Sequence, residues 1–178
     1  GYIVRAPQGW SQSNATGGVY NAVFTGIPNT GVVPAVIQKG PTGFNLIGNP
    51  YPSAIDIDLF LLDPANAGIT NGTVYLWSHN TGISNTIPGN SVYNYTRDDY
   101  AKYNITGGVK TASASITGGA IPTGKIASGQ SFFIEANTAL GSGNYTATFR
   151  NNMRVAGNND QFFRMASSDT VVPSGIEK

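Results

Sequence analysis

The stretch around which this sequence is organised is Gly43-Phe44-Asn45-Leu46-Ile47-Gly48-Asn49-Pro50-Tyr51-Pro52-Ser53-Ala54-Ile55-Asp56-Ile57-Asp58. Residues 44–48 are apolar and bounded by glycines, which is typical of a buried strand. The two prolines then exclude a helix over residues 49–53, because each one pushes its predecessor toward extended geometry. The Tyr51–Pro52 bond is a candidate for the cis form. The stretch therefore predicts a strand followed by a rigid corner.

Aliphatic residues resume after the corner with carboxylates between them, and we expect one short helix over residues 53–62. Ser53 would be its N-cap, with Asp56 at the capping-box position that Glu or Gln usually takes. Asp58 would also lie in the first turn, where the helix dipole favours negative charge. We favour this interpretation of the two aspartates over a cation site.

Short strands separated by turn signals make up most of the remaining chain, which contains 23 glycines and 10 prolines. Strands are expected at residues 2–6, 19–24, 32–39, 44–48, 72–79, 131–136, 144–150 and 161–165. Pro34 cannot donate a backbone hydrogen bond, so its strand should lie at a sheet edge or carry a bulge. The 131–136 strand is apolar on both faces and should be central.

This pattern predicts an all-β protein, an antiparallel β-sandwich of jelly-roll type with one short helix. Residues 1–166 would form a single domain, and residues 167–178 would be a polar tail or the start of a continuation. Residues 83–124 show no clear elements. A loop of that length is unusual in a compact domain, so this segment is either functional or contains short strands.

Composition excludes several classes of partner and chemistry. The 178 residues carry a net charge of +1 and only 11% charged side chains, which gives no reason to expect nucleic acid or an anionic membrane surface as a partner. No apolar run approaches the length of roughly 20 residues that spans a bilayer. The absence of cysteine excludes a disulfide scaffold, a thiolate metal site and a cysteine nucleophile.

Several blocks of the sequence resemble, in the same order, a pattern found in large secreted and surface proteins of Bacteroidetes. The blocks are Gly1–Pro7, Gly43–Ile55, Thr73–Thr81, Pro122–Ile134, Asn152–Val155 and Gln161–Arg164. The central one reads Phe-Asn-Leu-Ile-Gly-Asn-Pro-Tyr-Pro-Ser-Ala-Ile. The resemblance runs over almost the whole chain.

The resemblance implies location more than chemistry. Similar regions lie near the C-terminal end of long exported proteins, before a sorting domain that the type IX secretion system reads. Those proteins include adhesins, gliding-associated surface proteins and polysaccharide-degrading enzymes. We therefore expect a secreted or outer-surface location and neighbouring domains in the same polypeptide. The pattern of the family continues past Lys178, so one sheet edge is expected to be incomplete, and it supplies no catalytic residues to transfer.

A catalytic site has little support in the sequence, and we do not expect an enzyme. The chain has one histidine, His79, which a Ser-His-Asp arrangement would need. It lies in a strand of aromatic residues, and no nucleophile-elbow motif surrounds any serine. We therefore favour a structural role for His79 over a catalytic one.

Asp98 and Asp99 are the candidate metal ligands. Calcium takes oxygen ligands from carboxylates, amides and backbone carbonyls, and adjacent acids in a loop rich in such groups could hold a structural calcium ion. No EF-hand motif is present. The alternative, that both carboxylates are simply solvated, has about equal support.

Aromatic side chains are the candidate ligand-binding residues. Sugar-binding modules stack the apolar face of a pyranose ring on exposed Trp or Tyr and bond its hydroxyl groups to polar neighbours. The predicted platform comprises Trp77 with the loop residues Tyr93, Tyr95, Tyr100 and Tyr103. For Trp77 and its strand neighbour Tyr75, a place in the core is the favoured alternative, because large aromatic residues are usually buried.

These expectations together describe a non-catalytic extracellular binding or adhesion module. A polysaccharide or cell-surface glycan is the favoured ligand. The alternative is a structural spacer or export-associated domain without a ligand of its own.

Overall fold

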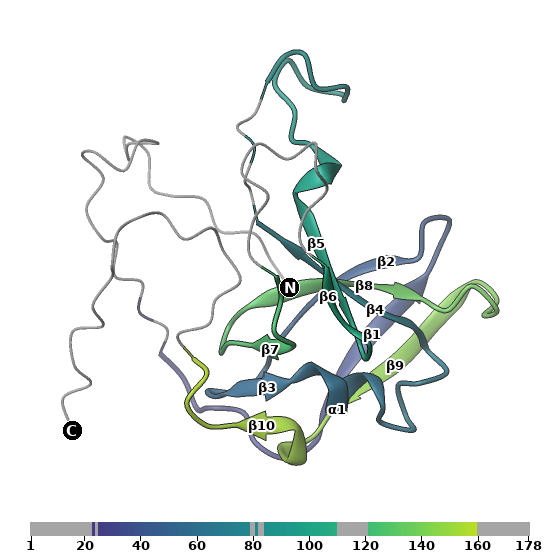
Figure 1. The fold of residues 1–178 in the computed structure, drawn as a ribbon. Helices are drawn as coiled ribbons and strands as arrows, with labels where there is room; N and C mark the ends of the chain where they lie inside the picture. Colours follow the sequence, from purple (N-terminus) through teal and green to yellow (C-terminus); the bar gives the residue numbers. More distant parts are fainter. Residues whose placement is uncertain (1–22, 24, 79–80, 82–83, 110–120, 160–178) are drawn as a thin grey trace.

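The computed structural model of the chain describes residues 23, 25–78, 81, 84–109 and 121–159 (Figure 1). The strands expected at residues 2–6 and 161–165, nearly all of 19–24, and the boundary between domain and tail lie outside the described residues. The described part is all-β, with antiparallel sheets and one short helix, as predicted. None of its helices is long and apolar enough to span a bilayer.

Three antiparallel sheets build the described part of the fold. The strands are β1 (Val33–Lys39), β2 (Phe44–Gly48), β3 (Ala54–Asp56), β4 (Thr70–Trp77), β5 (Tyr100–Asn104), β6 (Gly107–Val109), β7 (Lys125–Ile126), β8 (Ser131–Ala136), β9 (Gly143–Phe149) and β10 (Arg154–Val155). The helices are α1 (Ile57–Leu61) and the 3-10 turns η1 (Arg97–Asp99) and η2 (Asn151–Met153). The largest sheet has the order β2-β8-β4-β5-β6, and the smaller ones are β1-β9 and β10-β3-β7. Strand β8 lies inside the five-stranded sheet, as its apolar faces predicted.

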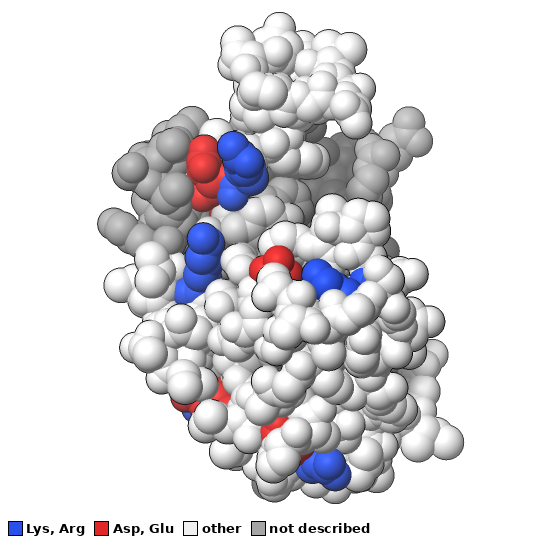
Figure 2. All heavy atoms as spheres, turned by 90° about the vertical axis from the view of Figure 1, so that its right-hand side faces the viewer, with Lys and Arg blue, Asp and Glu red and all other residues white. Residues whose placement is uncertain are grey.

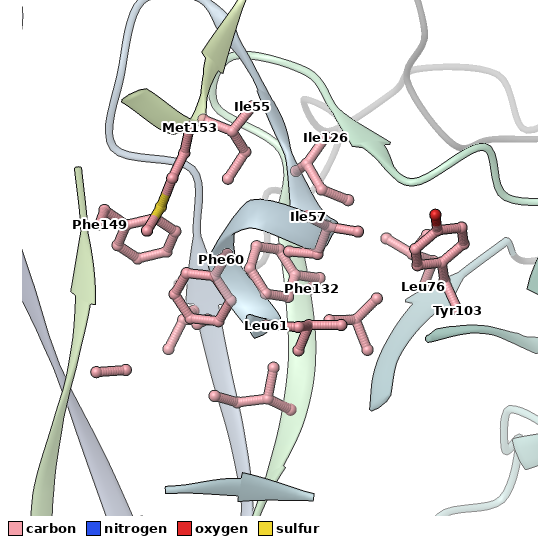
Figure 3. Packing of buried hydrophobic residues seen from close by; sticks show 14 of the residues in the cluster. Ile55, Ile57, Phe60, Leu61, Leu76, Tyr103, Ile126, Phe132, Phe149 and Met153 are labelled. Atoms are coloured by element: carbon pink, nitrogen blue, oxygen red, sulfur yellow. The ribbon is translucent and has the colours of Figure 1, made fainter. Parts of the chain in front are cut away.

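The core lies between the inner face of the five-stranded sheet and the elements that cover it, namely α1 and the two smaller sheets. Figure 3 shows Phe60 of α1 between Phe149 of β9 and Phe132 of β8. The ring centroids are 4.7 Å apart for Phe60 and Phe149, and 6.1 Å apart for Phe60 and Phe132. One helical side chain therefore connects two sheets.

Strand β1 is an edge strand among the described residues, as Pro34 predicted. It pairs only with β9, where Pro34 lies opposite Thr148. On the edge of β1 that faces away from β9, the backbone of Gln38 bonds to a side chain instead of to another strand. The Asn45 amide accepts from the backbone N–H of Gln38 at 2.8 Å and donates to its carbonyl at 3.0 Å. This side chain therefore replaces one rung of the ladder that β1 and β2 do not form.

The corner after β2 is held by Asn49, which is buried. Its side-chain N–H₂ reaches the carbonyl oxygens of Ser53 at 2.8 Å and of Ile126 and Ala127 at 3.1 Å each. Its side-chain oxygen accepts from the backbone N–H of Tyr51 at 3.0 Å. The described backbone contains no cis peptide bond, so the expectation of a cis bond in the corner was wrong.

The helix begins later than expected. Residues 54–56 form strand β3, which pairs with β7 and β10, and the helix covers only Ile57–Leu61. The N-cap is Asp56, whose carboxylate accepts from the backbone N–H of Asp58 at 3.1 Å, so Ser53 does not cap the helix. Pairing on both sides of β3 buries Ile55 and outweighs the local helical signal.

Candidate functional site

The outer face of the five-stranded sheet is aromatic. Its rings come from Phe44 on β2, Phe133 on β8, Tyr75 and Trp77 on β4, and Tyr100 on β5, joined by Tyr95 from the loop before η1; we call these residues the outer aromatic face. The pairing register puts the strand residues on one side of the sheet, because Tyr75 is opposite Phe133 and Trp77 is opposite Tyr100. Trp77 and Tyr75 are only partly buried, so the expectation that they belong to the core was wrong.

The rings of this face contact one another in perpendicular pairs. The centroid distance is 5.4 Å for Phe44 and Tyr75 and 5.7 Å for Tyr100 and Phe133, with interplanar angles of 72° and 82°. Each of these pairs reaches across the strand between its two members. Such edge-to-face contacts are the favourable geometry for aromatic rings and fix their orientation.

Tyr95 attaches the loop to the sheet. Its ring lies 5.0 Å from that of Trp77 at 89°, and 55% of the residue is exposed. The loop is held by Asn94, whose backbone exchanges two hydrogen bonds with Ser84 and whose side-chain N–H₂ donates to the carbonyls of Ile87 and Ser91. In Figure 1 this loop projects beyond the sheets, at the top of the view. Tyr93 lies on the same loop, 59% exposed, and the described ring contacts do not join it to the outer aromatic face.

Polar groups lie beside the rings. The Glu135 carboxylate accepts from the side-chain amide of Asn71, whose N–H₂ also lies 3.5 Å from the hydroxyl of Tyr75. The Lys102 ammonium group is 5.9 Å from the centroid of the Tyr75 ring. The space-filling view in Figure 2 shows a surface on which charged side chains are few and scattered. The site thus combines partly exposed aromatic rings with hydrogen-bonding groups and charges of both signs.

Tyr103 does not belong to this face. It is only 8% exposed, on the inner side of β5, so the expectation of an exposed loop residue was wrong. Its hydroxyl donates to Oδ2 of Asp58 at 3.1 Å, while the other oxygen of that carboxylate is buried and has no hydrogen-bond partner among the described residues. Burial raises the pKa of Tyr103 to about 12, and the hydrogen bond and the negative charges of Asp58 and Asp56 act in the same direction. Burial also raises the pKa of Tyr100.

A glycine makes room for that tyrosine. A Cβ atom built on Gly124 would lie 2.4 Å from the Tyr103 hydroxyl oxygen, and Gly124 has a φ of +79°, which other residues rarely adopt. The tight fit at Gly124 and the hydrogen bond to Asp58 mark Tyr103 as a structural residue.

Asp98 and Asp99 differ in their surroundings. Asp99 is buried, and its carboxylate accepts from the backbone N–H of Thr81 at 2.9 Å and from its hydroxyl at 2.8 Å. Asp98 is partly exposed, and its carboxylate accepts from the Thr96 hydroxyl at 3.1 Å. Within the described ranges, no group of three or more His, Asp or Glu residues is arranged to hold a metal ion. The calcium site stays a prediction, and His79 lies outside the described residues.

A family model described as Domain of unknown function (DUF8693) matches residues 1–176. The chain belongs to this family. Comparison with curated proteins gave no match, and neither did comparison with solved structures. For this DUF8693 domain, any functional assignment therefore has to come from its own residues.

Two members of the face of this DUF8693 domain, Phe44 and Phe133, were not predicted from the sequence. Because side chains alternate along each strand, Phe44 points to the opposite face from the buried Ile47, and Phe133 to the opposite face from the buried Phe132. However, alternation alone does not say which side faces the core, and only the pairing of β8 with both β2 and β4 brings the rings together. The signal for Tyr103 was present in residues 100–104, where Tyr100 and Lys102 alternate with Ala101 and Tyr103.

Proposed function

We propose that this domain is a non-catalytic binding module of an exported protein and that its ligand is a glycan. The observation that carries this proposal is the outer aromatic face, which leaves large rings partly open to solvent on a rigid sheet. Exposed Phe44 and Tyr95 mark its two ends, at 49% and 55% exposure. Soluble proteins rarely expose contiguous apolar surface without an interaction that uses it.

Sugar rings suit this chemistry. A pyranose presents an apolar C–H face, which stacks on aromatic rings, and a rim of hydroxyl groups, which need donors and acceptors. The amide of Asn71, the hydroxyl of Tyr75 and the carboxylate of Glu135 lie beside the rings and supply both kinds of partner. A purely apolar partner would cover these polar groups without offering them further hydrogen bonds.

The location is inferred from the resemblance to secreted and surface proteins of Bacteroidetes. We propose that the domain functions outside the cell, in an adhesive or substrate-holding role beside other domains of its polypeptide. The type IX secretion system is the proposed export route. A polysaccharide or cell-surface glycan is the partner that such a location offers.

Affinity electrophoresis of the 178-residue chain through gels that contain plant or marine polysaccharides tests the proposal directly. Retention is expected for the wild type, and Tyr95→Ala should weaken binding about tenfold, because one stacking contact with its buried area is lost. Tyr93→Ala is the matched control, because it removes the same side chain from the same loop without removing a described contact of the face. It should leave retention unchanged.

Absence of retention on every polysaccharide and on a glycan array would contradict glycan binding and favour the spacer role. In that case, deletion of residues 1–178 from the full polypeptide should reduce secretion or surface display. If Tyr93→Ala weakened binding as much as Tyr95→Ala, the binding surface would be the loop tip and not the sheet face.

A further inference from the structure

Ring orientation limits how many sugars the outer aromatic face can stack. The pairs Phe44–Tyr75, Tyr100–Phe133 and Trp77–Tyr95 have interplanar angles of 72°, 82° and 89°. Two rings that are nearly perpendicular cannot both lie parallel to a ligand above the sheet. Each pair therefore offers at most one ring face, and the described rings together provide up to about three stacking positions.

These positions are spread over several strands. Phe44 lies on the edge strand β2 and Tyr100 on β5, with β8 and β4 between them. Because adjacent strands are about 4.8 Å apart, the face extends over about 14 Å from β2 to β5. A pyranose ring is similar in size to one aromatic ring, so a single sugar can occupy only one stacking position. An occupant of the whole face has to contain several linked sugars.

Charge on the face excludes a strongly ionic ligand. Its described charged side chains include Lys102, over the ring of Tyr75, and Glu135, hydrogen-bonded to Asn71. Charges of both signs at the face do not favour a ligand of either sign. A sulfated or carboxylated glycan would need several arginine or lysine side chains to replace its hydration.

From these three observations we infer that the outer aromatic face binds an uncharged, unbranched polysaccharide through about three consecutive sugar units. The inference rests on the proposed glycan-binding function and specifies its ligand class. Linear chains fit because the rings are distributed across the sheet from β2 to β5, and a branch that points toward the sheet would separate the sugars from the rings.

Calorimetric titration of the 178-residue chain with length series of neutral oligosaccharides tests the inference. Cello-, xylo- and manno-oligosaccharides of one to six units are the probes. For the series that binds, affinity should rise about three- to tenfold with each added sugar up to about the third, which corresponds to one aromatic contact per unit, and then level off. Added salt should leave the affinity unchanged, because no ion pairs form.

Substitutions in the outer aromatic face should reduce the number of sugar units up to which affinity rises. Tyr95→Ala, on the exposed loop, should remove one stacking position, so that affinity levels off about one sugar earlier. Phe133→Ala should act similarly from the middle of the face. Tyr93→Ala should keep the wild-type profile, and circular dichroism of each variant establishes that it is folded.

The alternative outcomes separate the two claims. Full affinity for a monosaccharide would overturn the inference while glycan binding stands. So would tighter binding of alginate or polygalacturonate that weakens as salt is added. Failure to bind any polysaccharide or glycan would overturn the proposed function together with the inference.

Discussion

The two faces of the five-stranded sheet use the same strands for different purposes. On the inner face, Val74, Leu76 and Ile134 are almost completely buried and interlock with α1 and the smaller sheets. On the outer face, the alternate residues of the same strands are aromatic and partly exposed. Aromatic side chains carry large apolar areas, and on the outer face these areas are left partly in water. This contrast supports the proposal that the outer residues serve an interaction, whereas the inner residues hold the fold.

The sharpest test of this contrast uses two adjacent phenylalanines of β8. Phe132 points into the core and is fully buried, whereas Phe133 points to the outer face. Phe132→Ala should lower the free energy of unfolding by about 3–5 kcal/mol, because it leaves a cavity. Phe133→Ala should lower it by about 1 kcal/mol, through loss of cross-strand contacts. Urea unfolding measures both.

Binding should show the opposite order for the same pair. Phe133→Ala should lose glycan affinity, whereas Phe132→Ala, measured where it is still folded, should retain it. Equal destabilisation by both substitutions would mean that the outer rings are covered by structure, and the distinction between the faces would fail.

A second test concerns the polar contact of the inner face. Tyr103→Phe removes the hydroxyl that donates to Oδ2 of Asp58, a carboxylate whose Oδ1 already has no hydrogen-bond partner in the described part of the chain. Loss of a hydrogen bond to a charged group should lower the free energy of unfolding by about 1–3 kcal/mol. Asp58→Asn is the companion variant. A double-mutant cycle that gives independent, additive effects would contradict a direct coupling of the two side chains.

The same contact predicts a dependence on alkaline pH. The pKa of Tyr103 is raised from 10.0 to about 12, so the folded state keeps its proton more strongly than the unfolded state. The stabilisation is fully present below pH 10 and is lost as the pH rises through about 12. The stability difference between the wild type and Tyr103→Phe should therefore shrink over this range. Urea midpoints at successive pH values measure it, and a constant difference would argue against the raised pKa.

The smallest effect is expected from the charges beside the rings. Lys102 is exposed, so Lys102→Gln should change the free energy of unfolding by no more than about 0.5 kcal/mol. Binding of a neutral polysaccharide should also change little. A large loss of affinity, measured by the same titration, would show that Lys102 itself contacts the ligand.

Strand positions could be predicted well where composition and alternation agree. Residues 44–48 form β2 with the predicted bounds, and the alternation of Val74 and Leu76 with Tyr75 gives the two faces of β4. The helix start could not be predicted, because Ala54–Asp56 forms a strand only through its partners β7 and β10, which lie far away in the sequence. Local signals cannot show such partners.

The candidate site was predicted in part, for a similar reason. Trp77, Tyr95 and Tyr100 are in it, and their residue types pointed to stacking. Tyr103 was misplaced because residues 100–104 were treated as loop. Phe44 and Phe133 were missed because rings on separate strands meet only after the sheet has assembled.

The corner at Asn49 also affects the order in which the chain folds. Its amide bonds to the carbonyls of Ile126 and Ala127, which lie 77 and 78 positions later in the chain. Synthesis delivers the N-terminal part first, so the amide remains hydrated until the later segment has emerged. Contacts over such separations slow folding, because a long loop has to close before they form. The prolines restrict the corner from the start, but its final shape is reached only when both ends of this span are present together.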